Sequence, residues 1–398
     1  MSIEVAVVAI AKDEGAYIHE WIHHYLYFGF TRIIIGVNRT TDLTPKIIEK
    51  ISSQYPQVTF IEVDWIDQGS PAQKNPQFQA LSYAYLSNLI KQRYIDITHI
   101  LYADVDEFWF SHDFNLDVRT FLNSLPTFDM LSFSWLWQNG DSQIFEKPFK
   151  NLKVRPDIRM KSLIPISTLG HIVEFRCHAS KMDKALESFK HLDANGILIE
   201  YGEHDQLFSR APTLATNAFM LHRVCRSEVE YVAMLARERP GVALPFKNNR
   251  FGFSEDFSVA LKLENSYLEK YWSSLSEFIV KCAISPFIAT SKESVIKKAE
   301  RLLEKPGYIL AGNVVTLLQL LKGTSFQSKV LTKLESFGSD ILKDEFARGY
   351  FDAGLMLEKN KNLDQSVRYL RLANASRPNG PVIKQNLERL ESLLARLV

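Results

Sequence analysis

The first hundred residues alternate between two periodicities, and this alternation restricts the possible folds more than any other feature of the chain. Short, almost continuously apolar runs alternate with longer stretches in which apolar residues recur at helical spacing. The runs are 3–10, 32–37, 58–63 and 98–103, and the helical patterns are about 15–28, 44–54 and 76–93. Apolar runs of this length are typical of strands that are covered on both faces. The pattern predicts βαβ units and a mostly parallel sheet.

In such sheets, ligands bind outside the carboxyl ends of the strands. The segments at these ends are 11–15, 38–42, 64–70 and 104–107. The chain has no GxGxxG or GxxxxGK[ST] loop, which disfavours dehydrogenases and P-loop enzymes.

The later sequence changes character twice. Between about 127 and 225 the strand patterns are shorter, and in 129–137 the side chains of Leu131, Phe133, Trp135 and Trp137 share one face. After about 255 the pattern is helical to the end. We therefore expect an α/β domain with a mixed sheet over 1–254, followed by an all-α domain over 255–398.

One stretch of the helical tail has a further pattern. Small residues in 346–355, a polar turn, and apolar residues in 362–373 before Pro378 resemble a tetratricopeptide hairpin at 343–378. A single hairpin cannot bury both of its faces, so it must pack on neighbours or on a partner. Self-association or partner binding is one hypothesis, and a helical cap that only stabilises the fold is the other.

Charge and cysteine content exclude several classes of partner. Lys plus Arg number 47 against 46 for Asp plus Glu, so no overall field attracts nucleic acid. The three cysteines are widely spaced without a CxxC motif, as expected of thiols in a reducing compartment. The apolar run at 3–10 is too short for a membrane span and lacks the features of a signal peptide. We expect a cytoplasmic location, with any membrane contact peripheral and at the inner face.

The most informative residues are Asp104-Val105-Asp106-Glu107, which follow the fourth strand run. Two carboxylates one residue apart repel each other unless a cation lies between them. Hard divalent ions take oxygen ligands and bridge carboxylates to phosphates. A solvated acidic turn is the alternative, but the apolar strand before and the aromatic 108–110 after favour a binding site. The loop thus suits a pyrophosphate-bearing substrate.

Acids at other strand ends agree with this interpretation. Asp13 and Glu14 follow the first run and are candidates to accept hydrogen bonds from a uracil or ribose. Asp42 follows the second run and is a third candidate for nucleotide binding. Alternatively, Asp42 lies before Thr44-Pro45 and starts the next helix.

These segments together resemble GT-A glycosyltransferases of the family 2 and family 92 type. The matching segments, in order, are 11–22 with His24 and 28–30 (Lys-Asn-Glu, then Glu-Trp, His and Gly), 38–44 (Asn-x-Ser-x-Asp-x-Thr), 104–108 (Asp-x-Asp-Glu-Phe), 161–165 (Lys-Ser-Ile-Val-x-Pro) and 221–227 (His-Tyr-x-x-Arg-Ser). The order and spacing hold from residue 5 to about 241. Asp13 stands where Asn is usual, and Arg223 stands where Tyr is usual.

The resemblance implies a GT-A-like, Rossmann-like fold for 1–254 and a role for each motif. Mn²⁺ or Mg²⁺ would be bound by Asp104 and Asp106, with Asp104 also near the ribose. His222 is the candidate third ligand, with a hydrogen-bonded structural histidine as the alternative, and Lys161 would pair with the donor diphosphate. Lesser candidates for a metal ligand are His171 and His178.

Transfer with inversion also requires a carboxylate that deprotonates the acceptor hydroxyl. The segment 201–208 resembles the acidic element that carries this base, which indicates Asp205 or Glu203. Glu107 is the rival, and a solvated acidic turn is the alternative.

The implied activity is inverting transfer from a nucleotide sugar, such as a UDP-sugar, to a glycan or lipid-linked glycan in surface polysaccharide or lipooligosaccharide synthesis. The competing hypotheses are a metal-dependent nucleotidyltransferase or phosphohydrolase, and a non-catalytic protein that binds sugar nucleotides.

Overall fold

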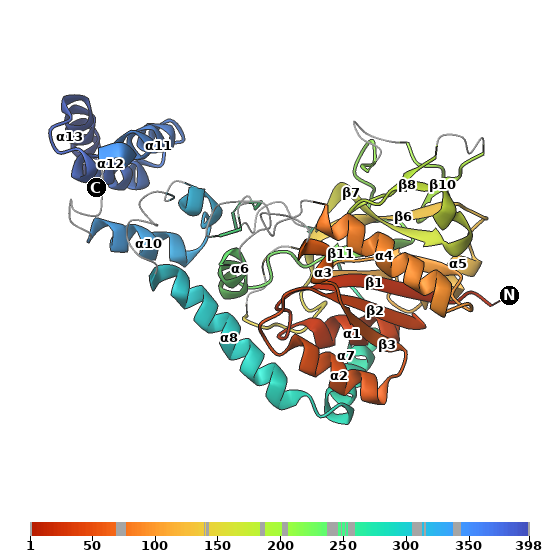
Figure 1. The fold of residues 1–398 in the computed structure, drawn as a ribbon. Helices are drawn as coiled ribbons and strands as arrows, with labels where there is room; N and C mark the ends of the chain where they lie inside the picture. Colours follow the sequence, from red (N-terminus) through yellow and green to blue (C-terminus); the bar gives the residue numbers. More distant parts are fainter. Residues whose placement is uncertain are drawn as a thin grey trace. The chain divides into compact units, whose positions relative to one another are not determined.

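The computed structural model describes two compact units (Figure 1). The first comprises Met1–Ser227 and Glu255–Val295, and the second comprises Glu228–Ser254 and Ile296–Val398. The two units do not divide at residue 254. The expected boundary there, between two domains that each fold by themselves, stays a prediction. The described residues are 2–68, 77–138, 140, 143–183, 188–200, 206–236, 246–247, 249–250, 252–253, 259–304, 313, 316–336 and 344–396.

The first unit is built on a mixed sheet in the strand order β3-β2-β1-β4-β7-β6-β11-β5. Its strands are β1 (Val5–Ala11), β2 (Arg32–Val37), β3 (Val58–Glu62), β4 (His99–Tyr102), β5 (Glu107–Ser111), β6 (Met130–Gln138), β7 (Lys153–Pro165) and β11 (Ala218–His222), with β10 (His191–Asp193) beside β6 and β12 (Val259–Ala260) beside β7. The first four strands are parallel, whereas β7 runs antiparallel to β4 and β6. The predicted fold class is confirmed: a mixed α/β sheet followed by a helical C-terminal region.

Helices cover both faces of the sheet, as the continuous apolar runs predicted (Figure 1). The helices here are α1 (Ile18–Tyr27), α2 (Thr44–Gln54), α3 (Trp65–Gln68), α4 (Phe78–Arg93), α5 (Val118–Asn123) and α7 (Asn265–Lys281). Alternate residues of β1 enter different cores: Val5 and Val7 pack with α1, α2 and α7, and Ala6 and Val8 pack with α4.

His24 connects three elements of the first core. Its Nε2 donates to the carbonyl oxygen of Trp109 in β5 at 2.5 Å, and the hydroxyl of Tyr271 in α7 lies 3.3 Å from Nδ1. All three residues are buried. The first helix of the expected C-terminal domain therefore packs within the sheet unit.

Two expectations about local structure need correction. Residues 108–110, expected only as an aromatic stretch after the loop, belong to β5, which pairs antiparallel with β11. Glu107, expected in the loop, is the first residue of β5 and is fully buried. Between β7 and β10 lie a short 3-10 helix, Ile166–His171, and the strands β8 (Ile172–Glu174) and β9 (Lys181–Met182).

The second unit is helical. Its elements are α6 (Glu228–Leu235), the end of α8 (Ser285–Glu304), α10 (Ser325–Glu335), the 3-10 helix Asp344–Phe346, α11 (Ala347–Lys359), α12 (Leu363–Ser376) and α13 (Pro381–Ala395). The expected hairpin at 343–378 forms α11 and α12. Gly354 lies against Leu370, and Ser366 Oγ donates to the Gly354 carbonyl at 2.7 Å. Across the part of the chain that the structure describes, no helix has both the length and the apolarity to cross a membrane.

Candidate functional site

The acidic loop joins β4 to β5 at the carboxyl end of β4. Its turn is closed from both sides: the Glu107 amide donates to the Asp104 carbonyl at 2.9 Å, and the Asp104 amide donates to Glu107 Oε2 at 2.8 Å. The Glu107 side chain thus folds back under the loop. This contact fixes the backbone that carries Asp104 and Asp106.

A buried lysine contacts two carboxylates of the loop. Lys161 Nζ lies 3.1 Å from both Asp104 Oδ2 and Glu107 Oε2, and the lysine side chain has no exposure. The antiparallel pairing of β7 with β4 places Lys161 there. The ammonium group of Lys161 contacts these two protein carboxylates, and its expected contact with a donor diphosphate stays a prediction.

Burial and neighbouring charges shift the pKa values of both buried groups of this cluster. Burial disfavours the lysine charge, but Asp104 and Glu107 outweigh it, so the Lys161 pKa lies well above its usual value. Burial raises the pKa of Glu107 well above that of an ordinary carboxyl group. Its Oε1 is buried without a hydrogen-bond partner among the described residues. Glu107 thus holds the loop from below, and its expected role as the rival catalytic base stays a prediction.

Asp104 is held from a third side by helix α4. Its Oδ1 accepts hydrogen bonds from Gln79 Nε2 at 2.8 Å and from the Tyr83 hydroxyl at 3.2 Å. The thiol of Cys177 in turn donates to Gln79 Oε1 at 3.1 Å. Both oxygens of Asp104 thus already accept protein donors, and its expected role as a metal ligand stays a prediction.

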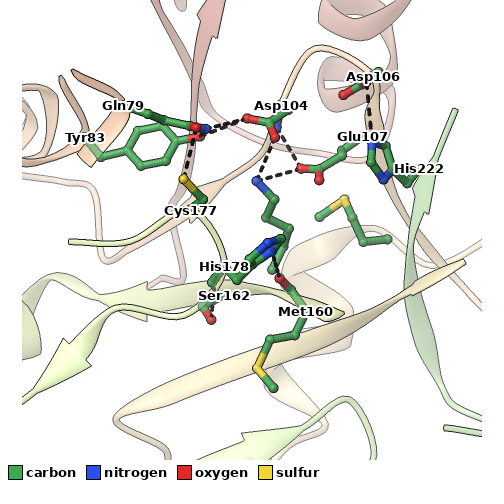
Figure 2. A network of polar contacts seen from close by, with 12 residues as sticks. Gln79, Tyr83, Asp104, Asp106, Glu107, Met160, Ser162, Cys177, His178 and His222 are labelled. Carbon is green, nitrogen blue, oxygen red and sulfur yellow. Dashed lines mark hydrogen bonds and ion pairs between the residues drawn. The ribbon is translucent and has the colours of Figure 1, made fainter. Parts of the chain in front are cut away.

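Asp106 and His222 form the part of the expected metal site that the structure brings together (Figure 2). His222 lies on β11, opposite Glu107, and its Nε2 lies 3.4 Å from Asp106 Oδ2. His222 is 6% exposed, and its Nδ1 is buried without a partner in the described part of the chain. A carboxylate and an imidazole at this separation fit two ligands of one divalent ion. No group of three or more His, Cys, Asp or Glu residues suited to a metal occurs among the described residues.

Of the two lesser histidine candidates, His178 lies near the acidic loop (Figure 2). His171 is exposed at the end of a 3-10 helix. His178 packs edge-on against Trp135, and its Nδ1 lies 3.2 Å from the Met160 carbonyl oxygen. Burial lowers the His178 pKa to about 4, which keeps the ring neutral near pH 7.

Arg223 holds the acidic loop through a backbone hydrogen bond to Asp106. Its amide donates to the Asp106 carbonyl at 2.8 Å. Its buried guanidinium lies 3.2 Å from Glu20 Oε2, and it also donates to Gln138 Oε1 and to the Glu146 carbonyl, each at 3.2 Å. In the sequence Arg223 was only a departure from the family pattern. Its partners come from distant segments, so no local signal pointed to this role.

The loops after β1 and β2 are joined by their own acids. Asp13 Oδ1 accepts from the Thr41 amide at 2.8 Å, and the Glu14 amide donates to Thr44 Oγ1 at 2.8 Å. Asp42 accepts from the Gly15 amide at 2.8 Å and from the Thr44 amide at 2.9 Å. Asp42 therefore accepts a hydrogen bond from the first residue of α2, as the alternative interpretation of this residue expected. Nucleotide binding by Asp13, Glu14 and Asp42 stays a prediction.

The two preferred base candidates, Glu203 and Asp205, lie outside the described residues. After them, Leu207 pairs with Arg159 and the Phe208 amide donates to the Ile158 carbonyl at 2.9 Å. The described end of this segment is thus attached to β7, the strand that carries Lys161.

The aromatic residues divide into core and edge. The side chains of 108–110 are fully buried, and Trp135 is 5% exposed. Trp137 is only partly buried, and the guanidinium carbons of Arg155 and Arg159 lie 5.7 and 5.4 Å from its ring centroid. Of these aromatic residues, Trp137 is the one that solvent reaches most.

Comparisons with known proteins give limited information. No protein-family model matches the chain, and no curated protein matches its sequence. Among solved structures, HddC from Yersinia pseudotuberculosis aligns over 48% of this chain and 91% of its own, with 13% identity and a TM-score of 0.27. An active-site mutant of LgtC aligns over 41% of this chain and 57% of its own, with 16% identity and a TM-score of 0.24. The galactosyltransferase LgtC in complex with donor and acceptor sugar analogs aligns over 40% and 58%, with 16% identity and a TM-score of 0.23. Similarity at this level carries no argument about activity.

Proposed function

We propose that this chain is a metal-dependent glycosyltransferase that transfers a sugar from a nucleotide-diphosphate sugar, such as a UDP-sugar, to a glycan or lipid-linked glycan. The observation that carries the proposal is the Asp106–His222 pair at the carboxyl edge of a mixed sheet, beside a carboxylate held by a buried lysine. Ligands bind at this edge in open α/β sheets.

Asp106 and His222 are the residues that would hold Mn²⁺ or Mg²⁺. A bound ion supplies Lewis-acid stabilisation of the departing nucleoside diphosphate. The chain's own contribution is orientation. The buried Glu107 and Lys161 hold the loop backbone and Asp104, and the Arg223 amide holds the Asp106 carbonyl. Both loop acids therefore keep fixed positions before any ligand binds.

Proton removal from the acceptor is assigned to Asp205 or Glu203, with inversion at the anomeric carbon. In support, the segment that follows these acids is attached to β7 at Ile158 and Arg159. Lys161, which holds Asp104, lies two residues farther along the same strand. Trp137, partly exposed and beside two arginines, is a candidate surface for an acceptor sugar ring.

The proposal extends to the setting of the reaction. The acceptor would belong to surface polysaccharide or lipooligosaccharide synthesis, with the protein in the cytoplasm and in peripheral contact with the inner face of the membrane. The second unit would mediate self-association or partner binding.

A single assay separates the proposal from its rivals. A panel of nucleotide sugars is incubated with the protein, with Mn²⁺ or with chelator, and the released products are separated. A nucleoside diphosphate that appears only with metal supports the proposal. In a parallel incubation with a nucleoside triphosphate and a sugar 1-phosphate, release of pyrophosphate would indicate a nucleotidyltransferase. Release of a nucleoside monophosphate and a sugar phosphate from the nucleotide sugars would indicate a phosphohydrolase, and donor binding without turnover would indicate a non-catalytic binding protein.

A further inference from the structure

Two of the three guanidinium nitrogens of Arg226 have no acceptor among the residues that the structure describes. Its Cζ lies 3.6 Å from the centroid of the Tyr17 ring, close enough for a cation–π contact. Its Nε and Nη2 are buried without a hydrogen-bond partner in the part of the chain that the structure describes. Buried donors of a charged group are unfavourable unless an acceptor satisfies them. Within the described residues, these two nitrogens therefore remain available to an acceptor from a ligand.

The backbone at Arg226 is also unfavourable. Its φ is 46°, in the left-handed region that side chains other than glycine rarely adopt. Strain of this kind persists where the surrounding structure enforces it, and it is frequent in ligand-binding segments. The residue thus combines backbone strain with unsatisfied donors, and neither feature contributes to folding stability.

Its place in the fold indicates which ligand would supply the acceptor. Arg226 lies four residues after His222 and three after Arg223, whose amide holds the Asp106 loop. Tyr17, on which it stacks, is the N-cap of α1 and follows the loop at the carboxyl end of β1. The guanidinium thus lies at the same sheet edge as the proposed metal ligands.

A second unsatisfied donor lies at the same turn. Ser291 is 3% exposed, and its Oγ has no partner among the described residues. A Cβ placed on Gly15 would lie 2.6 Å from this oxygen, so the hydroxyl is directly against the turn that leads into α1. No side chain caps this helix, although its Tyr17 and Ile18 amides each donate to the Glu14 carbonyl at 2.8 Å. Helix N-termini favour anions, and the two donors add to that preference.

We infer that Arg226, stacked on Tyr17, binds the diphosphate oxygens of the nucleotide ligand, with the Ser291 hydroxyl and the start of α1 beside it. A planar guanidinium matches two phosphate oxygens at once, which an ammonium group cannot do. The identity of the ligand as a nucleoside diphosphate rests on the proposed function, whereas the oxyanion site itself does not.

The test measures binding and not activity. Calorimetry on the full chain in chelator compares pyrophosphate, UDP and uridine for the wild type, Arg226→Gln and Arg226→Lys. Arg119→Gln, the same charge change at a half-exposed arginine of the same unit, is the matched control. We expect Arg226→Gln to weaken pyrophosphate and UDP at least tenfold, Arg226→Lys to weaken them less, and uridine binding and the control to stay unchanged.

A melting curve without ligand distinguishes a binding role from a structural one. Arg226→Gln removes two unsatisfied donors and also the cation–π contact with Tyr17, so its melting temperature should stay close to that of the wild type. A clear loss of melting temperature, pyrophosphate binding equal to wild type, or no pyrophosphate binding by the wild type would each overturn the inference. Arg226-dependent pyrophosphate binding in a protein that transfers no sugar would refute only the proposed function.

Discussion

The Lys161 ammonium lies 3.1 Å from the Glu107 carboxylate, and neither side chain has any exposure to solvent. A pair of this kind does little for net stability, because both groups lose their hydration, but removing one partner leaves an uncompensated buried charge. The pair therefore locks the loop in one arrangement and makes that arrangement sensitive to single substitutions.

Lys161→Met should be more damaging than Glu107→Gln. The first change leaves Asp104 and Glu107 facing each other without a counter-charge and should cost about 3–5 kcal/mol of unfolding free energy. The second leaves Lys161 paired with Asp104. Urea unfolding of both single variants and the double variant measures this asymmetry. Equal losses in the two single variants would contradict it.

Asp106→Asn and His222→Gln should abolish the metal dependence of donor binding with little change in stability. Asp106 is 28% exposed at its side chain, so its loss leaves no buried charge. If the ion contributes several kcal/mol to the reaction, turnover should fall at least about a hundredfold. Titration of Mn²⁺ with donor, alongside thermal melting, measures both effects. Full activity of wild type in chelator would rule out the metal role.

Acid should destabilise the first unit through the histidines of α1. Burial lowers the pKa of His19, His23 and His24 from 6.5 to about 3. The unfolded chain binds protons on these rings below pH 6.5 and the folded chain does not, so stability is full above pH 6.5 and is lost as pH falls toward 3. Each ring contributes about 1.4 kcal/mol per pH unit in that window.

Urea unfolding at pH 7.5 and pH 5.5 measures this loss, with His23→Gln as the comparison variant. His23 contacts Ser274 through Nε2, and burial alone lowers its pKa. The variant should show a shallower dependence of stability on pH. An unchanged slope would mean that other groups cause the acid sensitivity.

Asp205→Asn, or Glu203→Gln, should cut turnover by about 10²–10⁴-fold while donor affinity stays similar, since one positioned base contributes that much. Direct displacement would also give a β-linked product from an α-linked donor. Proton coupling constants of the product decide the stereochemistry, and an α-linkage would exclude inversion. Wild-type turnover in both variants would place the base outside this segment.

Self-association through the second unit is tested at its exposed apolar side chains. Met356 in α11 and Val382 in α13 are each 57% exposed. If this surface joins two copies, Met356→Glu with Val382→Glu should lower the molar mass measured by light scattering at unchanged helix content. An unchanged molar mass and unchanged partner binding would leave the stabilising-cap interpretation.

The sequence by itself determined the elements and the position of the acidic loop. Periodicity depends on neighbours in the chain, and so β1, β2, α2 and α4 lie within about three residues of their expected bounds. The same local reasoning placed Asp104 and Asp106 at the carboxyl end of the fourth strand. His222 was expected as a metal ligand beside Asp106 because of the resemblance to other proteins, and not because of its local sequence pattern.

Tertiary structure decided what each charged side chain does. Lys161 lies 57 residues from Asp104 in sequence, and only the antiparallel placement of β7 beside β4 joins them. Arg223 likewise meets Glu20 across 203 residues. A sequence pattern records which residues can form a strand but not which strands become neighbours. Whether a carboxylate is solvated, paired or buried depends on those neighbours, and this is why the sequence alone did not show that Glu107 is buried against Lys161.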